Sequence, residues 1–263
     1  MDMRKKVLGA EHPDTLISME SQASTYWNQG KWDEAEKLYV QVIDTRKKLL
    51  GAEHSDTLTS MENLAGTYKN QGRWDEAEKL FVQVVDMRKK LLGAEHPDIL
   101  THMGNLAGTY KNQGRWDEAE NLEVQVVDLM KKLLGAEHPE TLTSMGNLAG
   151  TYRNQGRWDE AEKLFVQVMN MRKKLLGEEH FDTLVSMVNL ASTYLNQGRW
   201  DEVEKLFVQV VDMMKKLLGV EHPATHQEKG NFLLSNLRQL LLHLVAIFFL
   251  ISFQNFQKSP QVN

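Results

Sequence analysis

The apolar residues of this chain recur at helical spacing in two neighbouring stretches. In the first stretch, successive apolar positions lie three, three, one and three residues apart, which places them on one face of a helix. These positions are Leu58, Met61, Leu64, Ala65 and Tyr68. The buried side expected for a second helix consists of Ala77, Leu80, Phe81, Val84, Leu91 and Leu92. The pattern predicts a helical hairpin, which cannot bury both faces of its second helix without a neighbour.

Polar residues and glycines set the expected ends of these helices. We expect Asp56 or Thr57 to cap the first helix. The Asn-Gln-Gly turn should end it, with Gly72 in a left-handed C-cap. We expect Asp75 to start the second helix, with Glu78 as its capping-box partner.

The two-helix pattern returns five times at an interval of 42 residues, the distance from Gly51 to Gly93. Each of these glycines is expected to stop a second helix, and the sequence Gly-Ala-Glu-His starts at both. The turn Asn-Gln-Gly-Arg-Trp-Asp-Glu starts at Asn70, Asn112, Asn154 and Asn196. A fixed period in this range indicates a solenoid, and a stack of near-copies usually provides a surface that holds another molecule.

Composition removes several classes of function. The chain of 263 residues has a net charge of −5, a pI near 6.0 and no cysteine. It therefore lacks the basic field that nucleic-acid binding requires, and it has neither disulfides nor thiol chemistry. The recurring Glu-His pair, as at Glu53 and His54, favours a turn over a metal site because successive copies lie one repeat apart. No nucleophile–base set is found, so we predict no enzyme and no cofactor.

The motif Asn63-Leu64-Ala65-x-x-Tyr68, followed by Asn-Gln-Gly-Arg-Trp-Asp-Glu-Ala, closely resembles the tetratricopeptide repeat (TPR). The longer period and the closing Arg-Lys-Lys-Leu-Leu-Gly-Ala-Glu-His-Pro-Asp resemble the kinesin light chain-like subtype. Repeats this uniform are also similar to arrays in fungal NB-ARC/TPR proteins. The resemblance implies an all-α fold, a right-handed TPR superhelix (α-solenoid) of five helical hairpins, whose concave groove binds a protein or peptide.

Two parts of these related proteins have no counterpart in the sequence. The heptad coiled coil that binds the kinesin heavy chain is missing, and so is the GxxxxGK[ST] phosphate loop of an ATPase domain. The resemblance therefore implies a partner-binding array and not a motor subunit.

Three regions are expected along the chain. Residues 1–11 hold the end of a preceding repeat's second helix, residues 12–223 hold the five repeats, and residues 224–263 hold a degenerate sixth repeat with an apolar C-terminal helix. Three interpretations of the last region stay open. It is a hydrophobic cap on the fifth repeat, a tail anchor formed by residues 232–253, or the product of a frameshift or unspliced intron.

By the family register, the groove-facing residues of the second repeat are Thr59, Glu62, Gly66, Lys69 and Asn70. Across the repeats this register implies a ladder of asparagines, three central cations and an apolar residue at each end. The expected peptide-binding residues are Trp27, Asn28, Lys69, Asn70, Lys111, Asn112, Arg153, Asn154, Leu195 and Asn196. Amides suit an extended peptide backbone, and cations suit acidic side chains.

Alternatives remain for two features of the groove. Glycines on its face either let a ligand approach the backbone or reflect drift among duplicated repeats; these are Gly104, Gly108, Gly146 and Gly150. The asparagines either contact a peptide or satisfy the last carbonyls of each first helix. The carboxylate clamp of chaperone-binding TPR proteins does not fit, because no repeat has Lys at the Glu62 position or Asn at the Gly66 position.

Three hypotheses of function follow. The first is a cytoplasmic, non-enzymatic scaffold whose groove binds an acidic peptide beside Lys69, Lys111 and Arg153. The second is a membrane-tethered TPR protein anchored by residues 232–253. The third is a truncated remnant of a fungal NB-ARC/TPR receptor-like protein, since the period begins late and breaks early.

Overall fold

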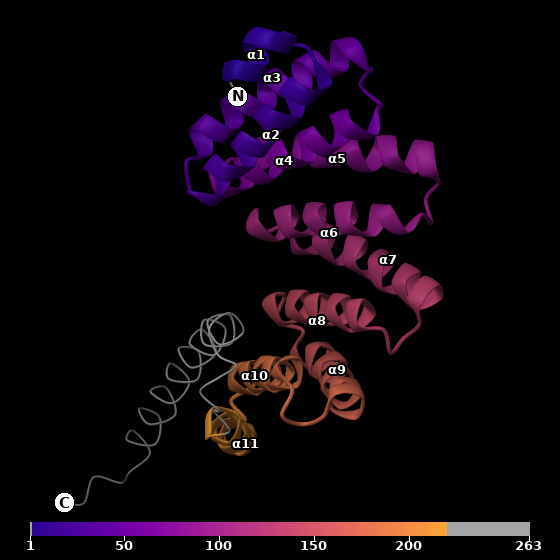
Figure 1. The fold of residues 1–263 in the computed structure, drawn as a ribbon. Coiled ribbons are helices and arrows are strands. Elements are labelled where there is room, and N and C mark those ends of the chain that lie inside the picture. The colour runs from indigo at the N-terminus through magenta and orange to yellow at the C-terminus, as the bar shows by residue number, and fades with distance from the viewer. Residues whose placement is uncertain (1, 220–263) are drawn as a thin grey trace, which may run out of the picture. The chain divides into compact units, whose positions relative to one another are not determined.

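The computed structural model describes residues 2–219, which form helices joined by short loops (Figure 1). This range holds eleven helices and no strand. The helices are α1 (Asp2–Leu8), α2 (Pro13–Asn28), α3 (Trp32–Leu49), α4 (Ser55–Asn70), α5 (Trp74–Leu92), α6 (Pro97–Asn112), α7 (Trp116–Leu134), α8 (Pro139–Asn154), α9 (Trp158–Leu176), α10 (Phe181–Asn196) and α11 (Trp200–Gly219). The expected all-α fold is confirmed, and the five hairpins are α2/α3, α4/α5, α6/α7, α8/α9 and α10/α11.

The chain divides into two compact units, Met1–Leu133 (unit 1) and Leu134–Asn263 (unit 2). The expected sixth repeat at 224–263 and the apolar stretch 232–253 lie outside the described residues. Among residues 2–219, no helix combines the length and the apolar character needed to cross a membrane.

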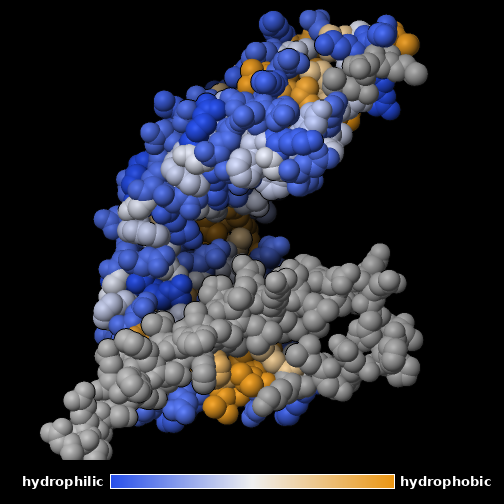
Figure 2. All heavy atoms as spheres, turned by 90° about the vertical axis from the view of Figure 1, so that its left-hand side faces the viewer, coloured by the Kyte–Doolittle hydropathy of each residue, from blue (hydrophilic) through white to orange (hydrophobic). Residues whose placement is uncertain are grey.

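The second helices α3 and α5 of unit 1 are each buried against two first helices. Phe81 of α5 is 3% exposed and packs in one cluster with Ala65 of α4 and Ile99 of α6. Val84 of α5 packs on α4 through Leu58 in a second cluster. Burying an aromatic side chain of this kind contributes about 2 kcal/mol. One hairpin supplies only one of the two first helices that cover a second helix, so the repeats must stack. Hydrophilic residues cover most of the described surface in Figure 2.

The last turn of α5 departs from the predicted pattern. Leu91 and Leu92 are 49% and 41% exposed, so the prediction that they are buried is wrong. The reason is length, because α5 has 19 residues and its partner α4 has 16. The extra turn of the longer helix has no helix of its own repeat to cover it.

Histidine, and neither Asp56 nor Thr57, caps the first helix of each repeat. The Nδ1 atom of His54 accepts a hydrogen bond from the backbone N–H of Asp56 at 3.2 Å. The helix begins at Ser55, which places the two expected caps inside it. Thr57 instead donates its hydroxyl to the carbonyl of Gly51 at 2.9 Å and so fixes the preceding loop. The Glu-His sequence is thus a turn element, and no group of metal-ligating side chains occurs within residues 2–219.

The first helix ends in the predicted left-handed turn. Gly72 has φ of +76°, a conformation that costs little only for a residue without a Cβ. The backbone N–H of Arg73 donates to the carbonyl of Tyr68 at 2.9 Å, and that of Gly72 to Lys69 at 3.1 Å. These two bonds form a Schellman motif, which satisfies the last carbonyls of the helix.

The second helix begins without the predicted capping box. The helix starts at Trp74, and its N-cap residue is Arg73. The Arg73 side chain makes no capping hydrogen bond to the helix. Glu78 instead accepts hydrogen bonds from the next repeat, from Gln113 Nε2 at 2.8 Å and from Arg115 Nη1 at 2.6 Å. The prediction failed because the partner of Glu78 lies in the following repeat and not in its own helix.

The same set of contacts joins successive repeats in both units, and we call it the inter-repeat latch. In unit 1, Arg115 also stacks on the ring of Tyr110, with 4.4 Å from guanidinium carbon to ring centroid. In unit 2, Arg199 bonds Glu162 at 2.8 Å. The hydrogen bonds to Glu78 and Glu118 raise the pKa of Arg115 above its usual value. Within each unit, the recurring Gln-Gly-Arg sequence therefore joins a repeat to the one before it.

Replacing Glu78 with Ala should lower the free energy of unfolding by about 1 kcal/mol, because Gln113 and Arg115 each lose one of their acceptors. The effect stays modest because the Arg115 side chain is 38% exposed and solvent screens the pair. Urea unfolding of the full chain measures it. Lys79→Ala, an exposed neighbour on α5, is the matched control, and equal stability of the two variants would contradict the role of the latch.

Candidate peptide-binding groove

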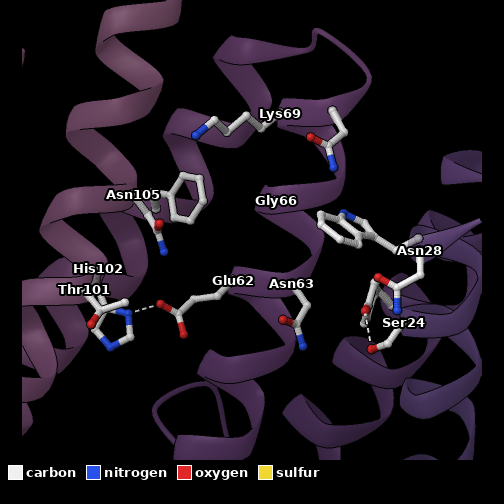
Figure 3. Close-up of a pocket in the computed structure, with 13 residues that line it drawn as sticks. Ser24, Asn28, Glu62, Asn63, Gly66, Lys69, Thr101, His102 and Asn105 are labelled. Carbon is white, nitrogen blue, oxygen red and sulfur yellow. Dashed lines mark hydrogen bonds and ion pairs between the residues drawn. The ribbon is translucent and has the colours of Figure 1, made fainter. Parts of the chain in front are cut away.

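A groove of about 460 Å³ opens in unit 1 where the first helices of three repeats follow one another. Glu62, Gly66 and Lys69 are spaced four and three residues apart on α4, which places them on one face of that helix. Tyr39 and Phe81, from the second helices α3 and α5, are buried side chains of the lining. The full lining is Ser24, Trp27, Asn28, Tyr39, Glu62, Asn63, Gly66, Lys69, Asn70, Phe81, Thr101, His102 and Asn105 (Figure 3).

Lys69 is a half-buried cation of the groove. Within the described part of the chain, no carboxylate lies within ion-pair distance of its ammonium group. Burial lowers the pKa of Lys69, and the nearby charge of Lys111 lowers it further. A cation in these surroundings would be stabilised by an anionic group that enters the groove.

Glu62, the acid that lines the groove, is paired with the cation Arg88 and contacts His102. Its Oε1 atom pairs with Nδ1 of His102 on α6, as the dashed line in Figure 3 marks. Its Oε2 atom lies 3.8 Å from Nη2 of Arg88 on α5. Because Glu62 is balanced in this way, Lys69 dominates the charge that the groove presents.

A related ionic cluster joins the first and second repeats. Arg46 is 5% exposed, and its Nη1 atom lies 3.0 Å from Oε2 of Glu20. The same nitrogen donates to the hydroxyl of Ser60 at 2.6 Å and to the carbonyl of Asp56 at 3.0 Å. A buried arginine is tolerated here because its charge is paired and its donors are used.

Comparison with known protein families decides the identity of the repeats. A model of the tetratricopeptide repeat matches residues 19–90, 56–132, 98–174 and 140–216. The chain belongs to the tetratricopeptide repeat family. This confirms the resemblance inferred from the repeat motif.

Solved structures place these TPR repeats in the kinesin light chain-like subtype. A kinesin light chain-like protein of Podospora anserina with nearly identical TPR-like repeats is 37% identical; the match covers 79% of this chain and 98% of that chain, with a TM-score of 0.72. BtubC (BKLC) of P. vanneervenii is 17% identical over 86% of this chain and 89% of that chain, has a TM-score of 0.69 and shares the fold. No curated protein matched the sequence. The repeats and these relatives support a protein–protein interaction scaffold, a class that is typically non-enzymatic.

The TPR groove brings together four of the residues expected to bind a peptide. Trp27 and Asn28 of α2 and Lys69 and Asn70 of α4 all line it. Thr59, expected on the same face, is not part of the lining. Its hydroxyl donates to the carbonyl of Ser55 at 3.0 Å.

Lys111 and Asn112, expected to continue the groove on α6, are not among its lining residues. The ammonium group of Lys111 pairs with Oε1 of Glu123 at 2.6 Å. Glu123 stands at the repeat position of Phe81 and is only 5% exposed. A carboxylate in an aromatic core position needs a counter-charge, and Lys111 supplies it. The replacement of Phe by Glu in an otherwise uniform repeat was the sequence signal for this pair.

The remaining predicted residues lie in unit 2. The guanidinium of Arg153 lies 5.8 Å from the ring of Phe165, and its Nη1 atom donates to the carbonyl of Asn189 at 3.4 Å. Burial lowers the pKa of Arg153. Asn154 and Asn196 are exposed at the ends of α8 and α10, and Leu195 is half-buried. The three expected cations thus have different surroundings: Lys69 faces the groove, Lys111 is paired with Glu123, and Arg153 lies beside the ring of Phe165.

Two alternatives left by the sequence are now narrowed. Backbone N–H groups of the Schellman turn satisfy the carbonyls near Asn70, and across residues 2–219 the side chain of Asn70 makes no hydrogen bond. The helix-capping explanation of the asparagines is therefore wrong. At Gly108, an added Cβ would lie 3.2 Å from Nζ of Lys69, so this glycine makes room for the cation. A Cβ at Gly104 would meet no atom within 4 Å.

Sequence reasoning missed several residues that line the groove. Asn63 and Asn105 bring two further amides into it, two helical turns before the expected ladder. Both belong to the Asn-Leu-Ala part of the motif, whose Leu and Ala were assigned to the core. Ser24 of the lining occupies the Gly66 position of the first repeat, and its hydroxyl lies 2.9 Å from that of Tyr39. The available signal was that Asn63 recurs at this position in four of the five repeats.

The Arg46 cluster gives a prediction for stability. Glu20→Gln should lower the free energy of unfolding by about 2 kcal/mol, because Arg46 keeps its charge in a buried site without its counter-ion. Adding Arg46→Met should restore most of the loss, since Met130 and Met214 occupy the same position in other repeats. Denaturant unfolding of the single and double variants measures this. Wild-type stability in Glu20→Gln would show that the ion pair contributes nothing.

Proposed function

We propose that the chain is a scaffold whose unit 1 groove holds an extended, acidic segment of a partner protein. The observation that carries this proposal is Lys69, a half-buried cation at the groove without a carboxylate partner within residues 2–219. An acidic side chain of the partner would pair with it in a site partly shielded from water, where an ion pair is stronger than at the open surface.

Amide side chains around Lys69 suit a peptide backbone. The lining includes Asn28, Asn63, Asn70 and Asn105. Each amide offers donors and an acceptor, as does each peptide unit of an extended segment. The indole of Trp27, 40% exposed, offers an apolar contact to a side chain of the partner. The groove thus supports recognition of both backbone and side chains.

The family and its relatives agree with this role. The Podospora anserina protein shares the TPR-like repeats, and such arrays are scaffolds that bind other proteins. We propose no catalytic activity and no cofactor. A cytoplasmic location and the tether at residues 232–253 stay predictions.

Binding of a short peptide rich in Glu and Asp with a single Trp tests the proposal. Lys69→Gln should weaken binding about tenfold, the loss of one half-buried ion pair, while wild-type affinity falls as salt rises. Fluorescence anisotropy with the full chain measures both effects.

The matched control is the double variant Lys111→Gln/Glu123→Gln, because Lys111 has the same place in the next repeat and removing both members of its pair leaves no buried carboxylate without a counter-charge. It should change affinity less than about twofold. The proposal fails if both variants weaken binding equally. It also fails if a peptide with Gln and Asn in place of the acids binds as tightly.

A further inference from the structure

One arginine in the repeats has lost the acid that balances it elsewhere. Second helices carry Arg46, Arg88, Met130, Arg172 and Met214 at one repeat position. The first helices carry Glu20, Glu62, Gly104, Gly146 and Val188 at the position that faces it in the first two repeats. Arginine and glutamate occur together twice and are absent together twice. Only the fourth repeat keeps the arginine, Arg172, opposite a glycine, Gly146.

The first repeat provides a template for what an acid does at this position. Glu20 places Oε2 3.0 Å from Nη1 of Arg46, and its Oε1 atom lies 3.0 Å from the hydroxyl of Ser60. Oε1 also lies 3.5 Å from Nδ2 of Asn63. One carboxylate on α2 therefore contacts three polar groups from two other helices, α3 and α4.

The polar groups of this template recur in unit 2 without the carboxylate. Nη1 of Arg172 donates to the hydroxyl of Ser186 at 3.1 Å and to the carbonyl of Asp182 at 3.2 Å. Nη2 donates to the hydroxyl of Thr143 at 3.1 Å. In place of the glutamate stands Gly146, where an added Cβ would meet no atom within 4 Å. The space that the acid fills in the first repeat is thus open.

The charge of Arg172 is left uncompensated by this loss. Among residues 2–219 no carboxylate lies within ion-pair distance of its guanidinium. Burial lowers the pKa of Arg172, and the field of Asp182 only partly opposes this. Arg153 lies on the same face of α8 as Gly146, two helical turns further on, and also has no acid partner in that range. A half-buried cationic site of this kind favours an anion.

We propose that Arg172, Ser186 and the space beside Gly146 form a socket for a carboxylate of a binding partner. The carboxylate takes the place that the Glu20 side chain has in the first repeat. It bonds to the guanidinium of Arg172 and to the hydroxyl of Ser186, as Glu20 does with Arg46 and Ser60. Ser186 now donates its one proton to the carbonyl of Asp182 at 2.9 Å. The Ser60 hydroxyl lies within hydrogen-bond distance of both Asp56 O and Glu20 Oε1, so the Ser186 proton can turn from the carbonyl to the carboxylate. The inference rests on the proposed function, because the carboxylate is a Glu or Asp side chain of the acidic partner protein.

Filling the socket from within the chain tests the proposal without a partner. Gly146→Glu supplies the missing carboxylate, and Gly146→Gln is the matched control of the same size and helix propensity. At neutral pH, Gly146→Glu should melt about 2–4 °C above Gly146→Gln. The difference should vanish at pH 3 and also in the Arg172→Met background, which copies Met130 and Met214. Equal melting temperatures at neutral pH would overturn the socket.

Sodium propionate, which carries the carboxylate of a glutamate side chain, provides an independent probe. At fixed ionic strength, it should shift the Arg172 side-chain NMR resonances of the wild-type chain and leave those of Gly146→Glu unchanged. Equal shifts in both proteins would overturn the proposal. Because propionate needs no peptide groove, a socket that binds it while acidic peptides fail would separate this inference from the proposed function.

Discussion

The burial of a second helix between two first helices, as at α3 and α5 of unit 1, is the constraint on which the rest of the structure depends. Phe81 of α5 is an example of this burial, because its ring packs in one cluster with Ala65 of its own repeat and Ile99 of the next repeat. This packing uses one face of every first helix for the core. The other face, which carries Glu62 and Lys69, is left free for the groove. Uniform packing and variable groove positions are therefore two results of one arrangement.

The sequence predicts what depends on local periodicity and misses what depends on the next repeat. Apolar spacing identified the hairpins, and Gly72 identified the turn. Glu78 was misplaced because its partners, Gln113 and Arg115, follow one repeat later. The family register placed Trp27 and Lys69 in the groove, but the signal that Lys111 is held by Glu123 lies twelve residues away, on the second helix of the repeat.

Charge balance separates structural from functional side chains in these near-identical repeats. The same first-helix position holds Lys69 and Lys111, yet only the second has a carboxylate partner among the described residues. Likewise, Arg46 is paired with Glu20 and Arg172 is not. A charge that the repeat satisfies internally stabilises the stack. A charge that it leaves unsatisfied in a partly buried site is available for a ligand.

The central claim is that a partner is held where the repeats differ, on the groove face of the first helices. An NMR titration of the labelled chain with an acidic, Trp-containing peptide tests it most directly. The account predicts shifts of the side-chain amides of Asn63 and Asn105, with the methyl groups of Leu91 and Leu92 unchanged. Shifts confined to those exposed leucines, with the groove amides unmoved, would contradict it.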